Sequence, residues 1–142
     1  GKPNLPNGII KNDFETIVML RKPGGYRSPT PEMEADSRIE NDDYFKWFAP
    51  IWSDITGART REHPAPYPVE LAYRLIRMFS FAGDSVLDPF LGSGTTLEAA
   101  IRAGRNGIGV EVEPAYVALA ERRLAALPFG VTLAVEDRSQ TA

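Results

Sequence analysis

A glycine-rich turn is the feature of this chain best suited to hold a ligand. It reads Gly92-Ser93-Gly94 and lies between a short apolar run at 85–88 and a helix-forming segment at 95–103. A strand that enters a helix through such a turn directs backbone N–H groups and the positive end of the helix dipole toward a ligand. Glycine has no Cβ, so the backbone can approach that ligand closely. The turn therefore suits a phosphate-bearing cofactor or the carboxylate of S-adenosylmethionine.

Glu111 is the second candidate, because it ends the next apolar run, "NGIGVE", about twenty residues after the turn. An acidic side chain at this place can bind both hydroxyls of a ribose. The chain has no G-x-x-x-x-G-K-[ST], which excludes a P-loop, and the turn lacks the third glycine of the dinucleotide fingerprint. Taken alone, these two features leave open a purely structural turn followed by a surface carboxylate.

The elements that would position this site alternate in the C-terminal half. Helix 95–103 is closed by Gly104, and a second helix is opened by Pro114 and runs to Leu127. Strands are predicted before, between and after the helices, at 85–88, 106–111 and 131–135. This β-α-β-α-β order predicts an α/β fold with a doubly wound, mainly parallel sheet.

The N-terminal half is less regular. Its predicted elements are a strand at 14–21 ended by "KPGG", a polar loop or exposed insertion at 28–43, a short amphipathic helix within 42–52 stopped by Pro50, and a helix that follows Pro68. The segment 57–68 has too many prolines to be helical throughout.

Composition restricts the chemistry further. The 142 residues suffice for one domain, and the absence of cysteine excludes disulfides, thiolate metal sites and a cysteine nucleophile on this chain. With His63 as its single histidine, the chain is not expected to hold a metal. A net charge of −3 gives no support for nucleic-acid binding by bulk electrostatics, although a local basic strip could still meet phosphates. No segment resembles a signal peptide or a membrane span, so a cytoplasmic protein without membrane contact is expected.

Three longer strings carry a resemblance. Residues 88–96, "DPFLGSGTT", resemble the cofactor motif of the amino-methylating DNA methyltransferases, which methylate N6 of adenine or N4 of cytosine. Upstream, "HPAPYP" at 63–68 followed by "ELAYRLI" is similar to the segment that precedes this motif in the family, and "FETIVMLRKPG" at 14–24 resembles the strand after the catalytic region. Together the three matches extend from residue 14 to about 124.

The resemblance implies S-adenosyl-L-methionine as cofactor and a Rossmann-like methyltransferase fold, present here as a partial domain. It also implies that the target base leaves the DNA duplex to meet the methyl donor. The residues that it assigns to the cofactor are His63, Pro64 and Ala65 on the methionine side, Asp88, Phe90, Gly92, Ser93, Gly94 and Thr95 around the turn, and Glu111 at the ribose. The alternatives for single members are a helix or turn cap for Asp88, Ser93 and Thr95, and core packing for Phe90.

The family's catalytic tetrapeptide, [DSN]-P-P-[YFW], is absent, because the chain contains no Pro-Pro pair. The order of the matched strings is the one in which the catalytic half comes first. We therefore expect a C-terminal, cofactor-binding half, with no catalytic residue of its own, that works with a catalytic half in the same or a separate chain. The expected division is 1–27 as strand and turn, 28–56 as an insertion and a candidate recognition region, and 57–142 as the cofactor-binding subdomain.

Duplex DNA is the expected partner, in the setting of restriction–modification, and a homodimer is left open. The candidate DNA contacts are Arg21, Lys22, Arg27, Arg59 and Arg61, for which a solvated surface is the alternative. Trp47, Phe48 and Trp52 could stack on an extruded base, but core packing is favoured for them. Two other functions stay open: a non-catalytic S-adenosylmethionine-binding half of a split enzyme, and a methyltransferase with a small-molecule or protein acceptor.

Overall fold

The computed structural model describes residues 15–55, 57 and 67–136. Its centre is a two-stranded parallel sheet of β1 (Ser85–Asp88) and β2 (Asn106–Gly109), in which Ser85 lies opposite Asn106 and Asp88 opposite Gly109. The crossover between the strands is α4 (Thr95–Arg102), and α5 (Pro114–Ala125) follows β2. The C-terminal half thus has the predicted β-α-β-α order, up to the end of α5.

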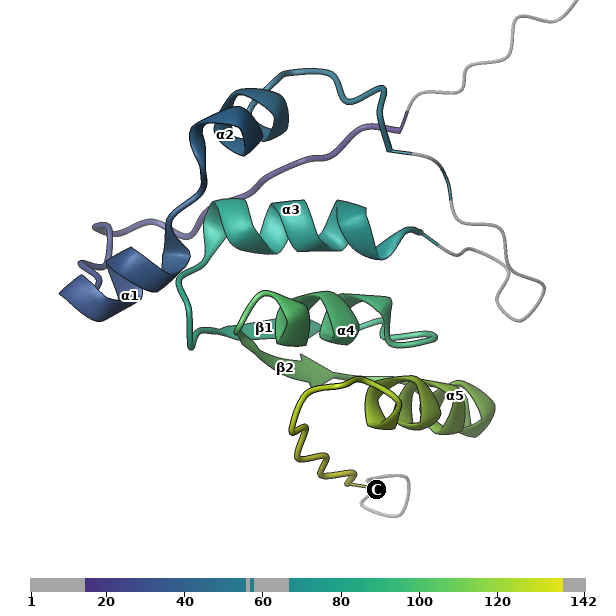
Figure 1. Ribbon diagram of the computed structural model, residues 1–142. Helices are drawn as coiled ribbons and strands as arrows, with labels where there is room; N and C mark the ends of the chain where they lie inside the picture. The colour runs from purple at the N-terminus through teal and green to yellow at the C-terminus, as the bar shows by residue number, and fades with distance from the viewer. Residues whose placement is uncertain (1–14, 56, 58–66, 137–142) are drawn as a thin grey trace, which may run out of the picture.

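In the described part of the chain, three helices precede the sheet: α1 (Pro31–Ser37), α2 (Asn41–Trp47) and α3 (Val69–Phe79). Figure 1 shows α3 lying along α4, with the two strands and α5 beyond α4. Alanines make this close approach of the helices feasible: Ala72 of α3, Ala99 and Ala100 of α4 and Ala103 at the C-cap of α4 form the buried cluster together with Ile76. Val86 of β1 packs against the same cluster, so α4 and α3 form successive layers on one face of the sheet.

The opposite face of the sheet is open. Leu87 and Ile108 are register partners in β1 and β2, and they are 62% and 55% exposed. Successive side chains of a strand point to opposite faces, so these two lie away from the face that packs on Val86's cluster. An apolar, uncovered sheet face of this kind is what a partial domain would have.

Two predicted strands are absent, and these predictions were wrong for the described residues. Residues 15–21 and 131–135 form no strand. The first of these segments carries Ile17, Val18, Met19 and Leu20 on the surface, and it passes on the α3 side of the molecule rather than beside β1 or β2 (Figure 1). β-propensity marks a residue that suits a sheet, but a strand also needs a neighbour to complete its hydrogen bonds.

The prediction of a loop across 28–43 was also wrong in part, because α1 lies within it. Thr30 is the N-cap of α1, and its hydroxyl accepts a hydrogen bond from the Met33 N–H at 3.2 Å. Pro31 and Glu32 then occupy the first turn, where a fixed φ and a negative charge both favour a helix. The helices predicted within 42–52 and after Pro68 are confirmed as α2 and α3.

No helix in the described part of the chain is long and apolar enough to cross a bilayer. The same residues contain no group of three or more histidine, cysteine, aspartate or glutamate side chains that could hold a metal ion.

Candidate cofactor site

Asp88 stands at the carboxyl end of β1 and fixes the start of the turn. One carboxylate oxygen accepts a hydrogen bond from the Phe90 N–H at 2.9 Å, and the other accepts the hydroxyl of Thr96 in α4. Its backbone carbonyl accepts from the Val110 N–H, which continues the sheet beyond β2. Asp88 therefore joins the end of a strand to the first turn of the following helix.

Glu111 lies on the neighbouring strand end and reaches across to the same turn. Its Oε2 accepts from the Gly92 N–H at 2.7 Å, and its Oε1 accepts from the N–H groups of Val112 and Glu113, each at 2.9 Å. Gly92 and Glu111, which are nineteen residues apart in the sequence, are thus in direct contact. The two parallel strands bring a carboxylate and a glycine turn to one edge of the sheet, where ligands of open α/β sheets bind.

The glycines of this turn have conformations that other residues rarely adopt. Gly92 has φ +54° and Gly94 has φ +83°, and both are buried. The Gly94 N–H donates to the Leu91 carbonyl at 3.1 Å, which closes a tight turn directly before α4. The first N–H groups of α4 have no acceptor one turn earlier in the helix, so they are suited to bind an anionic or carbonyl group.

Tyr67 was missed in the sequence, although it contributes to this site from the segment before α3. Its hydroxyl hydrogen-bonds to the hydroxyl of Thr96, which in turn donates to Asp88. Burial raises the pKa of the Tyr67 hydroxyl, and the nearby Asp88 carboxylate raises it further. The neutral Tyr67 thus ties the residues directly before α3 to the cofactor turn.

Comparisons with known proteins match this part of the fold. A family model for DNA methylases matches residues 1–122. The chain belongs to this DNA methylase family. It is 41% identical over 129 residues to the type II methyltransferase M.MthZI of Methanothermobacter thermautotrophicus, and 39% identical over 127 residues to M.MjaI of Methanocaldococcus jannaschii. The alignments cover 84% of this chain but only 36% and 41% of those two relatives.

The solved structures that resemble this chain are also named as DNA methylases or methyltransferases. A protein of Thermus thermophilus, provisionally named a DNA modification methylase and crystallised with S-adenosyl-L-methionine, is 54% identical, with a TM-score of 0.75 over 83% of this chain and 46% of that one. The PvuII DNA methyltransferase, which is cytosine-N4-specific, is 26% identical, with a TM-score of 0.50 over 66% of this chain and 37% of its own. The chain therefore spans about half the length, or less, of the relatives it matches, and it has their S-adenosylmethionine-dependent methyltransferase fold as a partial domain.

The remaining site assignments fall into three groups. Ser93 and Thr95 lie at the turn, and their hydroxyls accept hydrogen bonds from Arg123 of α5, which the sequence did not single out. Phe90 is 88% exposed, so core packing is not its role among the described residues. His63, Pro64, Ala65, Arg59 and Arg61 lie outside the described residues.

The other candidate DNA contacts lie in the exposed turn at 21–27. The Arg21 guanidinium stacks on the Tyr26 ring, 3.8 Å from its centroid, and Lys22 is exposed. Arg27 pairs with Asp84 at 2.5 Å. Because Asp84 comes directly before β1 and Asp88 ends it, Arg27 lies at the opposite end of the strand from the cofactor turn.

The tryptophans are packed, as favoured from the sequence. Trp47 is 5% exposed and meets Tyr73 of α3 edge to face, and Trp52 donates from its indole N–H to the Trp47 carbonyl at 2.8 Å. Phe48 is partly exposed and stacks on Tyr44. Of the three aromatic residues, Phe48 alone presents much of its ring to the surface.

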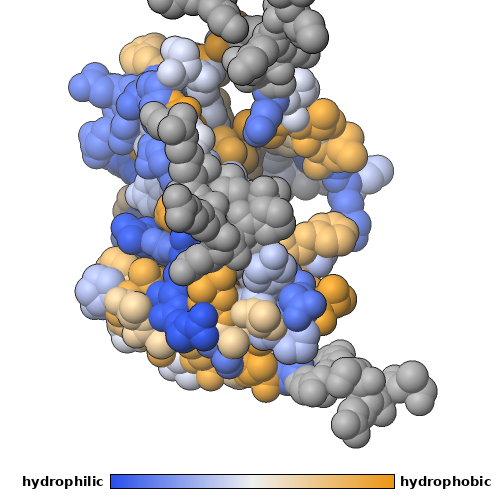
Figure 2. Space-filling model, turned by 90° about the vertical axis from the view of Figure 1, so that its right-hand side faces the viewer, coloured by the Kyte–Doolittle hydropathy of each residue, from blue (hydrophilic) through white to orange (hydrophobic). Residues whose placement is uncertain are grey.

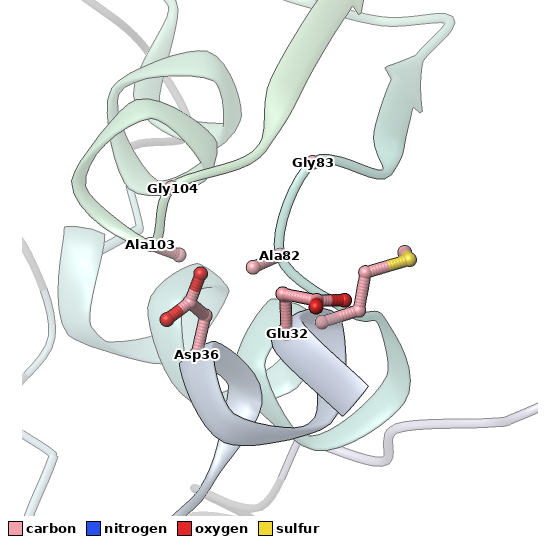
Figure 3. A pocket seen from close by; sticks show the side chains of 7 residues that line it. Glu32, Asp36, Ala82, Gly83, Ala103 and Gly104 are labelled. Atoms are coloured by element: carbon pink, nitrogen blue, oxygen red, sulfur yellow. The ribbon is translucent and has the colours of Figure 1, made fainter. Parts of the chain in front are cut away.

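A hollow exists elsewhere on the surface of the chain. It is lined by Glu32 and Asp36 of α1 and by the glycines at 83 and 104, which come just before β1 and β2 (Figure 3). It therefore lies at the amino ends of the strands, away from the glycine turn at their carboxyl ends.

Proposed function

We propose that this chain is the cofactor-binding half of a DNA methyltransferase that transfers a methyl group from S-adenosylmethionine to N6 of adenine or N4 of cytosine. The observation that carries the proposal is the 2.7 Å contact between Glu111 and the Gly92 N–H, which brings an acidic strand end and a glycine turn to one edge of a parallel sheet. The 54% identity with a protein crystallised with S-adenosyl-L-methionine supports the choice of ligand.

The donor set of the chain fits this cofactor. Glu111 has two acceptor oxygens at a strand end, which suit the vicinal hydroxyls of a ribose. Gly92 and Gly94 have positive φ values, which favour glycine, and because glycine has no Cβ a ligand can approach the backbone at both positions. The first turn of α4 offers N–H groups to the carboxylate of the amino-acid part, and the exposed Phe90 ring offers an apolar face to the cofactor. His63, Pro64 and Ala65 are proposed to line the methionine side.

When bound, S-adenosylmethionine supplies an electrophilic methyl group on its sulfonium, which an exocyclic amine nitrogen attacks as the sulfur leaves as a thioether and the amine loses a proton. This chain is proposed to hold the donor, and a second segment carrying a [DSN]-P-P-[YFW] motif to hold the amine. Direct transfer needs no covalent enzyme intermediate, so no cysteine or histidine nucleophile is required. Duplex DNA as partner, and pairing with a restriction activity as the type II relatives suggest, belong to the same proposal, as does a location with the DNA in the cytoplasm.

Binding of S-adenosylhomocysteine, followed by isothermal titration calorimetry, tests the cofactor. Gly92→Leu should abolish binding, because a side chain would stand where the backbone must meet the ligand. Glu111→Gln keeps the shape but removes the charge, and it should weaken binding by about tenfold, as expected when one charged hydrogen bond is lost. Glu121→Gln, the same change at an exposed position of α5, is the matched control and should bind like wild type. Tight binding of ATP or NAD with no S-adenosyl ligand would refute the proposal.

Methyl-transfer activity tests whether the catalytic residues lie on a second segment. Residues 1–142 alone should transfer no methyl group to duplex DNA, because they contain no Pro-Pro pair to hold the amine. Adding the catalytic half, in cis or in trans, should restore transfer of tritiated methyl groups to adenine or cytosine. Robust methylation by the 142 residues alone would show that the catalytic residues lie on this chain.

A further inference from the structure

Arg123 of α5 binds the cofactor turn through its side chain. One terminal nitrogen of its guanidinium donates to the Ser93 carbonyl and to the Ser93 hydroxyl, both at 3.0 Å, and to the Thr95 hydroxyl at 2.8 Å. Its Nε lies 2.9 Å from Oε2 of Glu98 in the first turn of α4. A single planar side chain thus binds the turn and the helix that follows it.

Glu98 holds the guanidinium in this orientation. The Glu98 side chain is 9% exposed, and its second oxygen pairs with Arg102 at 2.7 Å. A buried carboxylate with a cation on each oxygen has little freedom to turn. Arg123 is therefore fixed on one side by an ion pair and on the other by the turn.

The backbone of the turn rests on the same face of α5. A Cβ at Gly94 would lie 3.0 Å from the Cβ of Ala120, and Ala120 is three residues before Arg123. Residues three apart lie on one face of a helix. α5 thus supports the turn at two points, by close packing at Ala120 and by hydrogen bonds at Arg123.

The contacts with α5 restrict a backbone that its glycines would otherwise leave flexible. Gly92 and Gly94 allow a ligand to approach the backbone, but glycine also permits many other backbone conformations. The peptide between Ser93 and Gly94 is planar, so fixing the Ser93 carbonyl toward α5 fixes the orientation of the whole peptide unit. The N–H of this peptide unit belongs to Gly94 and donates to the Leu91 carbonyl directly before α4, so the bond from Arg123 also fixes the point at which the helix starts.

We propose that Arg123 is a positioning residue for the cofactor: it holds the Ser93 carbonyl and the Thr95 hydroxyl toward α5, so that the N–H groups at the start of α4 stay directed at the S-adenosyl ligand. This inference rests on the proposed function. Arg123 acts through Ser93 and Thr95 and need not touch the ligand itself.

The test compares Arg123→Lys with Arg122→Lys in the full-length protein. Lysine keeps the positive charge but loses the planar fork that binds Glu98 and the turn together. Arg122 is the adjacent, exposed residue of α5, so it controls for the same chemical change outside the turn. Affinity for S-adenosylhomocysteine is measured by calorimetry, and amide exchange of residues 89–97 by mass spectrometry without ligand.

Arg123→Lys should weaken binding by about 10- to 100-fold, the loss expected for hydrogen bonds that involve a charged group. It should also speed amide exchange in 89–97 while exchange in α3 stays unchanged, and the KM for S-adenosylmethionine should rise much more than kcat falls. Thr95→Val, which removes one acceptor only, should give a smaller change in the same direction. Arg122→Lys should match wild type in all of these measurements.

The two proposals fail in different ways. If wild type binds S-adenosylhomocysteine and Arg123→Lys binds equally well with unchanged exchange in 89–97, the positioning role is overturned while the proposed function stands. A variant that melts earlier but keeps wild-type affinity well below its melting temperature would likewise overturn it, because support of the fold alone predicts that result. If wild type itself does not bind the ligand, the proposed function fails and this inference falls with it.

Discussion

At the scale of single residues, Gly94 combines a backbone requirement with a packing requirement. Its φ of +83° lies in the left-handed region, and its α-carbon faces Ala120 of α5 so closely that a Cβ would be 3.0 Å from the Ala120 Cβ. Gly104 shares only the first property, since its φ is +73° but a Cβ there would meet nothing within 4 Å. Substitution of Gly104 therefore measures the free-energy cost of the strained backbone alone, while substitution of Gly94 adds the cost of displacing Ala120.

We expect Gly94→Ala to destabilise the protein more than Gly104→Ala. Each variant should lose about 1–2 kcal/mol of unfolding free energy from the left-handed backbone. Gly94→Ala should lose about 1–3 kcal/mol more, because α5 must move away from the turn. Urea denaturation measures both, and Ala120→Gly in the Gly94→Ala background should recover part of the additional loss. Equal losses at the two positions, with no recovery, would show that α5 does not pack tightly on the turn.

The sequence identified some residues of this site and missed others for a physical reason. Gly92 and Glu111 could be paired because consecutive parallel strands end at the same edge, which converts a spacing along the chain into proximity. Arg123 and Tyr67 act through side chains that come from other elements. Their contacts depend on how α5 and the segment before α3 pack, and no local pattern in the sequence encodes that packing.

At the scale of elements, the segment from α2 to residue 55 is attached to α3 by one buried cation. Arg74 is 2% exposed; it pairs with Asp54 at 2.7 Å and with Glu70 at 2.7 Å, and its guanidinium lies 5.5 Å from the centre of the Trp52 ring. The hydrogen bonds from Arg74, and then from Lys46, hold the pKa of the Asp54 carboxyl well below its ordinary value. Both tryptophans of the chain, Trp47 and Trp52, lie in this segment, so their fluorescence reports on its attachment.

We expect Asp54→Asn to loosen this segment, because Arg74 would keep its burial but lose a charged partner. The tryptophan emission should shift to the red, while the far-ultraviolet circular dichroism stays nearly unchanged. Asp36→Asn, the same change at an exposed site in α1, should leave the emission as in wild type. An unchanged spectrum in Asp54→Asn would show that aromatic packing alone holds the segment.

The same contact gives a pH dependence. Since the pKa of Asp54 is lower in the folded protein, its stabilising effect is complete above the ordinary aspartate value of about 3.9 and is lost as the pH falls below it. A red shift that develops on acidification in wild type should therefore be reduced in Asp54→Asn, in which the shift is already present at neutral pH.

The segments 15–21 and 131–135, which were predicted as strands and form none, show what the sequence alone does not determine at this scale. The helices α3, α4 and α5 could be located because most hydrogen bonds of a helix are made within its own segment. A strand instead depends on which other segment lies beside it, and neither region has a paired neighbour among the described residues. Leu133 and Val135, like Ile17 to Leu20, remain exposed as apolar side chains suited to a sheet.

At the scale of the whole molecule, the sheet has one packed face and one open face. Leu87 and Ile108 lie side by side on the open face, and Val110, just beyond β2, is 51% exposed. Other apolar side chains reach the surface on the side to which the carboxyl ends of the strands point (Figure 2). Among the described residues, the two paired strands also leave an unpaired edge on each side of the sheet, which is a template for association.

We therefore expect residues 1–142 on their own to self-associate as their concentration rises and to bind an apolar dye such as anilinonaphthalene sulfonate. Leu87→Lys and Ile108→Lys should reduce both effects, because a charge in the middle of the open face opposes burial of that face. Phe45→Lys changes an exposed apolar residue of α2, away from the sheet, and serves as the control. Sedimentation velocity over a range of concentrations measures the association.

If the catalytic half covers this face, adding it should suppress dye binding by wild type but not by the lysine variants, whose interface would carry a buried charge. A chain that stays monomeric at all concentrations and binds no dye would show that the open face is compatible with water, and the case for a completing segment at the sheet would be lost.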